Sequence, residues 1–308
     1  MTNITAQMVK ALRDQTGAGM MDCKAALAET DGDNTAAIDW LRAKGLSKAA
    51  KKSGRVAAEG LVGSALGEKS GALVEVNAET DFVARNEQFQ DLVRKVAALS
   101  LENRGDLAAT SSADYPGVGK SVADHITELV GTIGENMTLR RSAALAVENG
   151  VVSAYMHNAI ASGLGRIGVL VALESVADSE KLAALAHQLA MHVAAASPLA
   201  ASVDELDPEV IARERQVLAE QARESGRPDN IIDKMVEGRM RKFYEEVVLT
   251  SQAFVIDTDR TVGQVIEDAA KELGSPVTLA GFVRMSLGEG IEREESDFAA
   301  EVAAAAGS

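Results

Sequence analysis

Residues 72–86 read Ala72-Leu-Val-Glu-Val-Asn-Ala-Glu-Thr-Asp-Phe-Val-Ala-Arg-Asn86, and this stretch indicates both a fold and a surface. Its first half alternates apolar residues with Glu75 and Asn77, which is the period of a half-buried strand. The second half is mostly polar and carries one aromatic residue, Phe82, before a helical pattern begins. A strand and a helix arranged in this way would hold Asp81 and Phe82 outward on a rigid tip. We expect such a tip to contact a partner rather than to carry out catalysis.

Strand and helix patterns follow one another on both sides of this stretch. The strand patterns cover residues 61–66, 73–77, 138–145 and 151–157, and the helical patterns cover residues 86–103 and 121–134. The tripeptide Glu148-Asn149-Gly150 separates two of the strand patterns, and its Asn-Gly pair is the strongest hairpin signal in the chain. We therefore predict an α+β fold with an antiparallel sheet and a hairpin at Gly150.

A strand pattern that leads into a helical pattern occurs twice. Residues 71–76 lead into a helical pattern that ends near Ala98, and residues 167–173 lead into one that ends near Ala195. Two related subdomains, each an antiparallel sheet with a helix, would explain the repeat. We place the first at residues 61–160 and the second at residues 161–292.

The chain before residue 61 has only helical patterns. A helix at residues 5–14, a second that Asp22 is expected to cap, and a third that stops near Gly45 predict a three-helix domain over residues 1–45. Met20 and Met21 stand at the start of the second helix, where they either serve a contact surface or fill the small core. The Lys-rich residues 46–60 are interpreted as a basic, helical linker.

Two further helical regions lie within and after the second subdomain. Residues 208–243 carry two helical patterns, between which Gly226 can end one helix and Pro228 can begin the next. This predicts an antiparallel hairpin arm, which could be a partner surface, a dimer surface or an inserted decoration. A helix near residues 262–273 and a strand at residues 277–287 follow. The acidic residues 293–308 are predicted to form a C-terminal helical module in which Phe298 is expected to be buried.

Composition narrows the classes of function. The 308-residue chain has a net charge of −15, which argues against a protein whose main task is to bind nucleic acid. Residues 1–55 nevertheless hold nine Lys or Arg against six Asp or Glu, a net of +3, so the remainder carries −18. The single cysteine, Cys23, cannot form an internal disulfide. Because no signal-peptide pattern and no apolar run of roughly 20 residues is present, we expect a cytoplasmic protein without membrane contact.

Motifs that resemble catalytic or cofactor sites lack the context that such sites need. The glycines at 163, 165 and 168 match a dinucleotide-binding pattern, but a strand pattern follows them where a helix is required, so we expect a flexible loop. Gly119-Lys120-Ser121 lacks the leading glycine and the strand of a phosphate-binding loop, and we expect a loop that opens a helix. The histidines lack further ligands for a metal and are expected to be satisfied core residues: His125, His157, His187 and His192. We predict no catalytic residue, no metal and no cofactor.

Five motifs, in order along nearly the whole chain, resemble the bacterial elongation factor Ts family. They are Thr16-Gly-Ala-Gly-Met-Met-Asp-Cys-Lys-Ala-Ala-Leu27, Lys48-Ala-Ala-Lys-Lys52, Val76-Asn-Ala-Glu-Thr-Asp-Phe-Val-Ala-Arg85, Met191-His-Val-Ala-Ala195 and Met235-Val-Glu-Gly-Arg-Met240. Several long motifs in the family's order are far more specific than any single one. Residues 158–164 depart from the pattern, because they look longer than the family's short link into the Arg-Ile-Gly-Val strand.

The resemblance implies an exchange factor that binds elongation factor Tu and promotes the release of GDP and its exchange for GTP. It also implies a ubiquitin-associated-like N-terminal domain, a coiled-coil hairpin arm and a C-terminal module. In that family, the segment that reaches into the GTPase and disturbs its Mg²⁺ site corresponds to Thr80, Asp81, Phe82 and Val83. The same comparison implies further contacts with the GTPase from Arg13, Met20, Met21, Lys24 and Lys52, and places His157 beside the phenylalanine.

Other functions stay open at this point. An acidic scaffold could bind a partner without affecting nucleotide, and an assay of fluorescent GDP release would separate it from an exchange factor. An enzyme that uses His157 is disfavoured because no second catalytic group can be identified. The sequence also leaves open whether the arm contacts the GTPase or a second copy of the chain in a homodimer.

Overall fold

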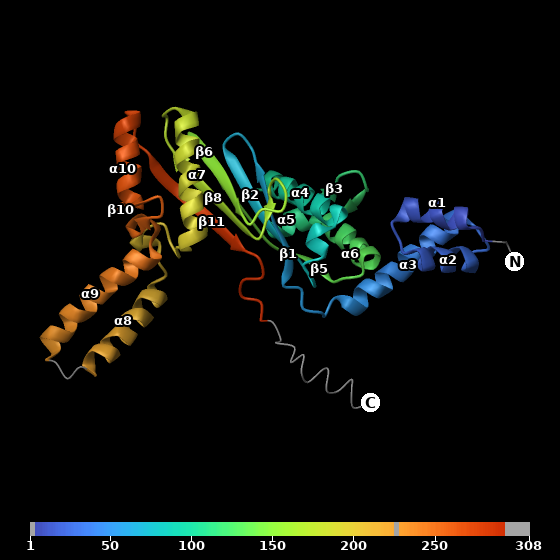
Figure 1. The fold of residues 1–308 in the computed structure, drawn as a ribbon, viewed down its shortest axis with the longest axis horizontal. Helices are drawn as coiled ribbons and strands as arrows, with labels where there is room; N and C mark the ends of the chain where they lie inside the picture. The colour runs from blue at the N-terminus through green and yellow to red at the C-terminus, as the bar shows by residue number, and fades with distance from the viewer. Residues whose placement is uncertain (1–3, 225–227, 293–308) are drawn as a thin grey trace.

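The computed structural model of the chain describes residues 4–224 and 228–292. Within these residues the protein combines helices with antiparallel sheets, so the predicted α+β class is confirmed. Figure 1 shows the N-terminal helices at one end, sheets with helices beside them in the middle, and a helical hairpin that projects at the other end. No helix of the described ranges is both long enough and apolar enough to span a bilayer.

Three helices form a small bundle at the N-terminal end: α1 (Ala6–Thr16), α2 (Met20–Glu29) and α3 (Asn34–Lys52). The side chains of Thr5 and Asp33 accept hydrogen bonds from backbone N–H groups at the starts of α1 and α3. The expectation that Asp22 caps α2 is wrong, because Gly19 holds the cap position. Asp22 lies in the first turn, where its carboxylate pairs with two lysines of α3.

The third helix does not stop near Gly45, as the sequence suggested, but continues to Lys52. Gly45 lies where α3 crosses α6 (Val122–Ile133), and it faces Gly131 of α6. A Cβ atom on Gly131 would lie 2.8 Å from the Cα of Gly45. The glycines at this crossing therefore allow two helices to approach closely, and neither of them ends a helix.

The first sheet has the strand order β5-β2-β1-β7. Its strands are β1 (Glu59–Leu66), β2 (Ser70–Ala78), β5 (Met137–Ala146) and β7 (Leu164–Gly165). The helices α4 (Glu87–Glu102) and α6 share a core with one face of this sheet, beside α5 (Leu107–Ser112) and a hairpin of β3 (Asp114–Tyr115) and β4 (Lys120–Ser121). The strands and helices predicted in this region are confirmed, with small shifts at their ends.

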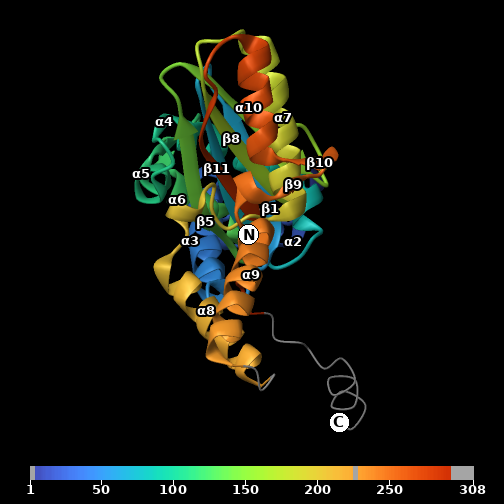
Figure 2. The ribbon, with the colours of Figure 1, turned by 90° about the vertical axis from the view of Figure 1, so that its left-hand side faces the viewer.

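The second sheet has the strand order β11-β8-β6. Its strands are β6 (Gly150–His157), β8 (Ile167–Glu174) and β11 (Thr278–Ser286), and its outer face packs on α7 (Ser179–Ala196) and α10 (Val262–Leu273). Figure 2 shows α7 and α10 in front of β8. The inner faces of the two sheets pack together, with Val62 and Leu73 against Leu170 and Met285, so the layers are helix, sheet, sheet and helix. In each sheet a central strand leads into the helix that covers it, as the repeat in the sequence suggested.

The predicted hairpin at Gly150 is wrong. β5 pairs with β2 in the first sheet and β6 pairs with β8 in the second, so the turn at residues 147–149 carries the chain from one sheet to the other. Val147 donates its N–H to the carbonyl of Lys69, just before β2 of the first sheet, and the next two N–H groups donate to the Glu174 carboxylate of the second sheet. An Asn-Gly pair indicates a tight turn, but it does not decide whether the strands on either side pair with each other.

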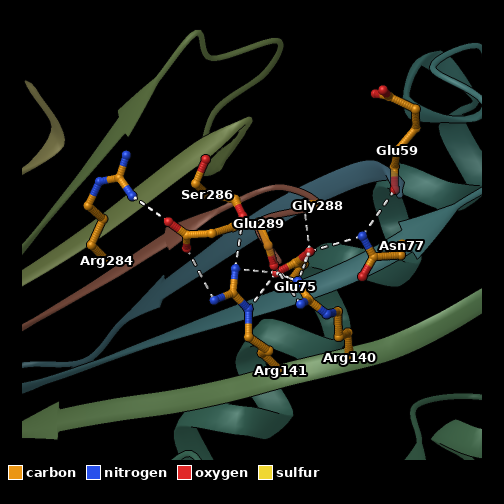
Figure 3. A network of polar contacts seen from close by, with 9 residues as sticks. All are labelled: Glu59, Glu75, Asn77, Arg140, Arg141, Arg284, Ser286, Gly288 and Glu289. Atoms are coloured by element: carbon orange, nitrogen blue, oxygen red, sulfur yellow. Dashed lines mark hydrogen bonds and ion pairs between the residues drawn. The ribbon is translucent and has the colours of Figure 1, made fainter. Parts of the chain in front are cut away.

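β2 is buried on both faces and not half-buried, because it lies between α4 and the second sheet. Glu75 and Asn77, the polar residues of its alternating pattern, have no exposed surface. The Glu75 carboxylate accepts hydrogen bonds from the Asn77 amide and the Gly288 N–H and pairs with Arg140 and Arg141 (Figure 3). This network ties β2 and β5 of the first sheet to the segment that follows β11 of the second.

The predicted helical hairpin consists of α8 (Pro208–Arg223) and α9 (Asp229–Val247), which share a core of their own. Pro228 directly precedes α9, as expected, whereas Gly226 lies outside the described residues. The 3₁₀ turns η2 (Val203–Glu205) and η3 (Leu249–Ser251) stand before and after the hairpin.

A small hairpin that the sequence patterns did not reveal follows η3. It consists of β9 (Ala253–Phe254) and β10 (Asp257–Thr261), and Thr261 and Gln264 then form a capping box at the start of α10. The strand predicted at residues 277–287 is β11. The predicted C-terminal helix, with Phe298, lies outside the described residues.

Candidate functional site

The loop between β2 and α4 presents the tip that the sequence predicted. A single 3₁₀ turn, η1 (Val83–Arg85), precedes α4, and Asn86 caps that helix. Asp81 is exposed and Phe82 leaves 75% of its surface exposed, while Val83 is only 4% exposed and packs in the core beneath α4. The loop therefore projects Asp81 and Phe82 and is anchored at Val83.

The other end of the tip is anchored at Thr80. The Thr80 N–H and hydroxyl donate to the two oxygens of the Glu135 carboxylate, at 2.9 Å and 2.7 Å. One residue earlier, the Glu79 carboxylate accepts the Asn136 N–H at 2.6 Å and pairs with Arg55 at 3.3 Å. These contacts lie directly beyond the last paired residues of the β2–β5 ladder.

Sequence reasoning missed Glu79, Glu135 and Asn136. Glu79 and Glu135 are far apart in the chain, and each stands in a segment with several other charged or polar residues. Only the pairing of β2 with β5 brings them together. No local pattern could have identified them.

Four residues predicted to contact a partner lie exposed on the N-terminal bundle. Met20 and Met21 expose 54% and 76% of their surfaces, and Arg13 and Lys24 are also exposed. The alternative that both methionines fill the core of the bundle is therefore wrong. The structure gathers Met20, Met21 and Lys24 on α2, at one end of the molecule, whereas β2 and its tip belong to the central sheets (Figure 1).

Lys52 connects the bundle to the neighbourhood of the tip. Its ammonium group donates to the carbonyl of Gly134, the residue that caps the C-terminus of α6. A cation is favoured at this end of a helix dipole. Because Gly134 directly precedes Glu135, Lys52 lies beside the turn that holds Thr80.

His157 stands at the end of β6 with an exposed ring, whose Nδ1 is 3.2 Å from the Tyr155 hydroxyl. Its carbonyl accepts the N–H of Arg166, and the Arg166 guanidinium pairs with Glu59 at 3.0 Å. Glu59 is opposite Ala78, the last residue of β2. The fold thus brings His157 to the same end of the sheets as the tip, with Tyr155 as the aromatic neighbour of its ring.

His192 is a satisfied core residue, as expected. Its ring has no exposed surface, Nδ1 accepts the Val255 N–H at 3.2 Å, and Nε2 donates to the Gln252 side chain at 2.9 Å. Burial lowers the pKa of His192, although the bond to Gln252 opposes this effect, so the ring is neutral. The same expectation is wrong for His157 and His187, which are exposed. Among the described residues, no group of three or more His, Cys, Asp or Glu could hold a metal ion.

The glycines at 163, 165 and 168 lie in a region that packs tightly and not in a flexible loop. Leu164 and Gly165 form β7, and Gly168 lies within β8. A Cβ atom on Gly168 would be 2.6 Å from a methyl carbon of Val62, so this glycine allows the two sheets to approach. Ser121 caps α6, as expected of a loop that opens a helix.

The chain is similar to known proteins over nearly its whole length. A family model described as Elongation factor TS matches residues 79–289. Elongation factor Ts of Rhodospirillum rubrum is 64% identical over 305 residues, which cover 99% of each chain. Elongation factor Ts of Parvibaculum lavamentivorans is 61% identical over 306 residues, again 99% of each chain, and that of Rhizobium meliloti is 62% identical over 303 residues, 98% of this chain and 99% of the relative. The chain therefore belongs to the elongation factor Ts family of translation elongation factors.

Proposed function

We propose that this chain is a guanine-nucleotide exchange factor for elongation factor Tu. It binds the GTPase, promotes the release of GDP and its exchange for GTP, and catalyses no bond chemistry of its own. Membership of the elongation factor Ts family supports this function. The observation that carries the mechanism is the exposed Phe82 beside Asp81, on a loop that is anchored on both sides.

The thermodynamic linkage between binding of nucleotide and binding of the exchange factor defines what such a protein must do. It has to bind the empty GTPase more tightly than the nucleotide-bound GTPase, and nucleotide must then weaken its binding by the same factor. In GTPases, Mg²⁺ bridges phosphate and protein oxygens, so a group that displaces its ligands loosens the nucleotide. We propose that the segment of residues 80–83 enters near this Mg²⁺ site, with Phe82 as an apolar wedge and Asp81 as a competing carboxylate.

A second contact region is proposed on the N-terminal bundle. Exposed methionine and arginine side chains are types that protein interfaces favour, and Met20, Met21 and Arg13 supply them together with Lys24. Lys52 and His157 are proposed as further contacts: Lys52 lies beside the turn that holds Thr80, and His157 lies at the tip's end of the sheets.

The substitution Phe82→Ala tests the proposal. We expect the stimulated release of fluorescent GDP from elongation factor Tu to slow by about 10- to 100-fold, as for the loss of an aromatic hot spot. Because the ring is mostly exposed, the stability of the chain should change by less than about 0.5 kcal/mol, measured by urea unfolding.

Val176→Ala is the matched control, because Val176 is an equally exposed apolar residue, at 78%, elsewhere on the surface. It should leave GDP release unchanged. Normal release by Phe82→Ala would reject the wedge. A wild-type chain that binds the GTPase without accelerating release would instead favour the acidic scaffold.

A further inference from the structure

A reciprocal pair of glutamates joins the base of the tip to the turn after α6. Glu135 accepts both the N–H and the hydroxyl of Thr80, and Glu79 accepts the N–H of Asn136. The Asn136 amide in turn donates to the Arg55 carbonyl at 2.8 Å. Each strand end thus holds the backbone of the other, one and two residues beyond the point where the β2–β5 ladder stops.

We propose that Glu135 is a positioning residue for nucleotide exchange, which fixes where Asp81 and Phe82 stand without itself contacting the GTPase. This inference rests on the proposed function. Hydrogen bonds to a carboxylate are about twice as strong as those between neutral groups, and Glu135 makes two of them to a single residue. It is therefore a firm attachment for Thr80.

The anchors leave only two residues free to project. Thr80 is fixed by Glu135, and Val83 is fixed in the core beneath α4. Without Glu135, Thr80 loses its attachment, and the loop is held only at Glu79 and at Val83, so the direction of the Phe82 side chain is less firmly fixed. The loss of Glu135 should therefore act through Phe82.

The same turn also fixes the N-terminal bundle. The carbonyl of Gly134, the residue before Glu135, accepts a hydrogen bond from the Lys52 ammonium of α3. In addition, α3 crosses α6 where Gly45 contacts Gly131. One turn thus holds both proposed contact regions, the tip and the bundle, in a fixed relation. A GTPase that engages α2 therefore meets Phe82 at a set place.

The test measures release of fluorescent GDP from elongation factor Tu over a range of exchange-factor concentrations. For Glu135→Ala we expect the maximal rate of GDP release to fall about ten-fold or more, because even a small displacement of Asp81 and Phe82 should slow release strongly. The half-saturating concentration should change by less than about three-fold. Glu135→Gln keeps one acceptor oxygen and can donate to the Thr80 hydroxyl, so it should lose less than the alanine variant.

Glu174→Ala is the matched control. The Glu174 carboxylate also accepts two backbone N–H groups of a turn, those of Glu148 and Asn149 at 2.9 Å and 3.1 Å, and it lies at the opposite end of β8 from the tip. Its loss should leave the maximal rate unchanged. An equal fall in this control would overturn the positioning role, since the effect would then be one of general stability.

A double substitution separates positioning from a general loss of structure. Glu135→Ala should lower the rate much less in a Phe82→Ala background than in the wild-type chain, because the positioned group is then absent. Equal losses in both backgrounds, or a rise in the half-saturating concentration alone, would contradict the proposal. Normal release by Phe82→Ala alone would reject the wedge and, with it, a positioning role that acts through Phe82. A wild-type chain that does not accelerate GDP release would instead reject the proposed function.

Discussion

Glu75 carries a charge at a place where the protein exposes no surface of that residue. Burial by itself raises the pKa of Glu75, but the Gly288 N–H, the Asn77 amide and Arg141 outweigh it and hold the pKa below its ordinary value. Arg140 also donates to the backbone carbonyl of Glu289, and Arg141 pairs with the Glu289 carboxylate, which offsets part of the second positive charge. The ionised carboxylate is thus the stable form between the sheets.

Removing the charge of Glu75 should destabilise the fold. Glu75→Gln leaves two arginines without their buried partner, and we expect the free energy of unfolding to fall by about 3 kcal/mol, as when one member of a buried ion pair is lost. Urea unfolding followed by circular dichroism measures the change. Asp268→Asn, which removes only the surface pairs with Lys271 and Arg260, serves as control and should leave the midpoint unchanged.

The difference in stability between the wild-type chain and Glu75→Gln should depend on pH in a definite direction. Because the pKa of Glu75 is lowered in the folded state, its contribution is fully present above the unfolded-state pKa of about 4.3 and is lost as the pH falls through the folded-state pKa. The gap between wild type and Glu75→Gln should be constant from pH 8 to 6 and should narrow below about pH 4. A gap that narrows between pH 8 and 6 would contradict this assignment.

Single residues differ in how far the sequence reveals them. Phe82 could be identified because a large aromatic residue in a polar segment suggests a contact surface. Glu75 and Glu135 could not, because each binds partners from another strand or turn and looks locally like a solvated charge. The exposed tip was therefore predictable, whereas the side chains that hold it were not.

The crossing of α3 and α6 leads to a prediction at the scale of elements. Alanine is favoured over glycine by about 1 kcal/mol inside a helix. At position 131, however, the added methyl group would collide with the backbone of Gly45, so Gly131→Ala should destabilise the packing of the bundle on α6. Thermal unfolding followed by circular dichroism measures the effect.

Gly238→Ala is the control for that substitution. Gly238 lies inside α9, and nothing lies within 4 Å of the place that its Cβ would take. This variant should gain about 0.5 to 1 kcal/mol from helix propensity. Equal gains for Gly131→Ala and Gly238→Ala would show that the close crossing does not exist in solution.

Elements were predicted well where local periodicity decides them, as in α4 and α10. The prediction failed where long-range packing decides. Gly45 looked like the end of a helix but lies at a helix crossing, and the Asn149-Gly150 pair looked like a hairpin but joins strands of different sheets. The half-buried pattern of β2 was misleading because Glu75 and Asn77 bind partners between the sheets and not water.

At the scale of the whole molecule, buried histidine limits stability in acid. His192 joins α7 to the segment that follows the helical arm, through Gln252 and Val255. A proton on its Nδ1 would face the Val255 N–H, so the folded chain resists protonation that the unfolded chain accepts below its ordinary pKa of about 6.5. Burial lowers the pKa of His125 in the same direction.

We therefore expect the free energy of unfolding to fall as the pH drops from 7.5 to 5.5, with His192 contributing up to about 1.4 kcal/mol. His192→Gln should be less stable overall, but it should lose that part of the pH dependence. Urea midpoints of both proteins at the two pH values measure this. The same slope in both proteins would show that His192 does not resist protonation.

The strand order of the second sheet has a consequence for how the protein is made. β8 follows β6 closely in the chain, but its other neighbour, β11, comes only after the helical arm and α10 have been synthesised. Pairing between distant segments is slow, and an unpaired strand edge is a template for association with other chains. Every newly synthesised molecule therefore passes through a stage in which one edge of β8 is open, and a chain that ends within the arm would keep that edge open permanently.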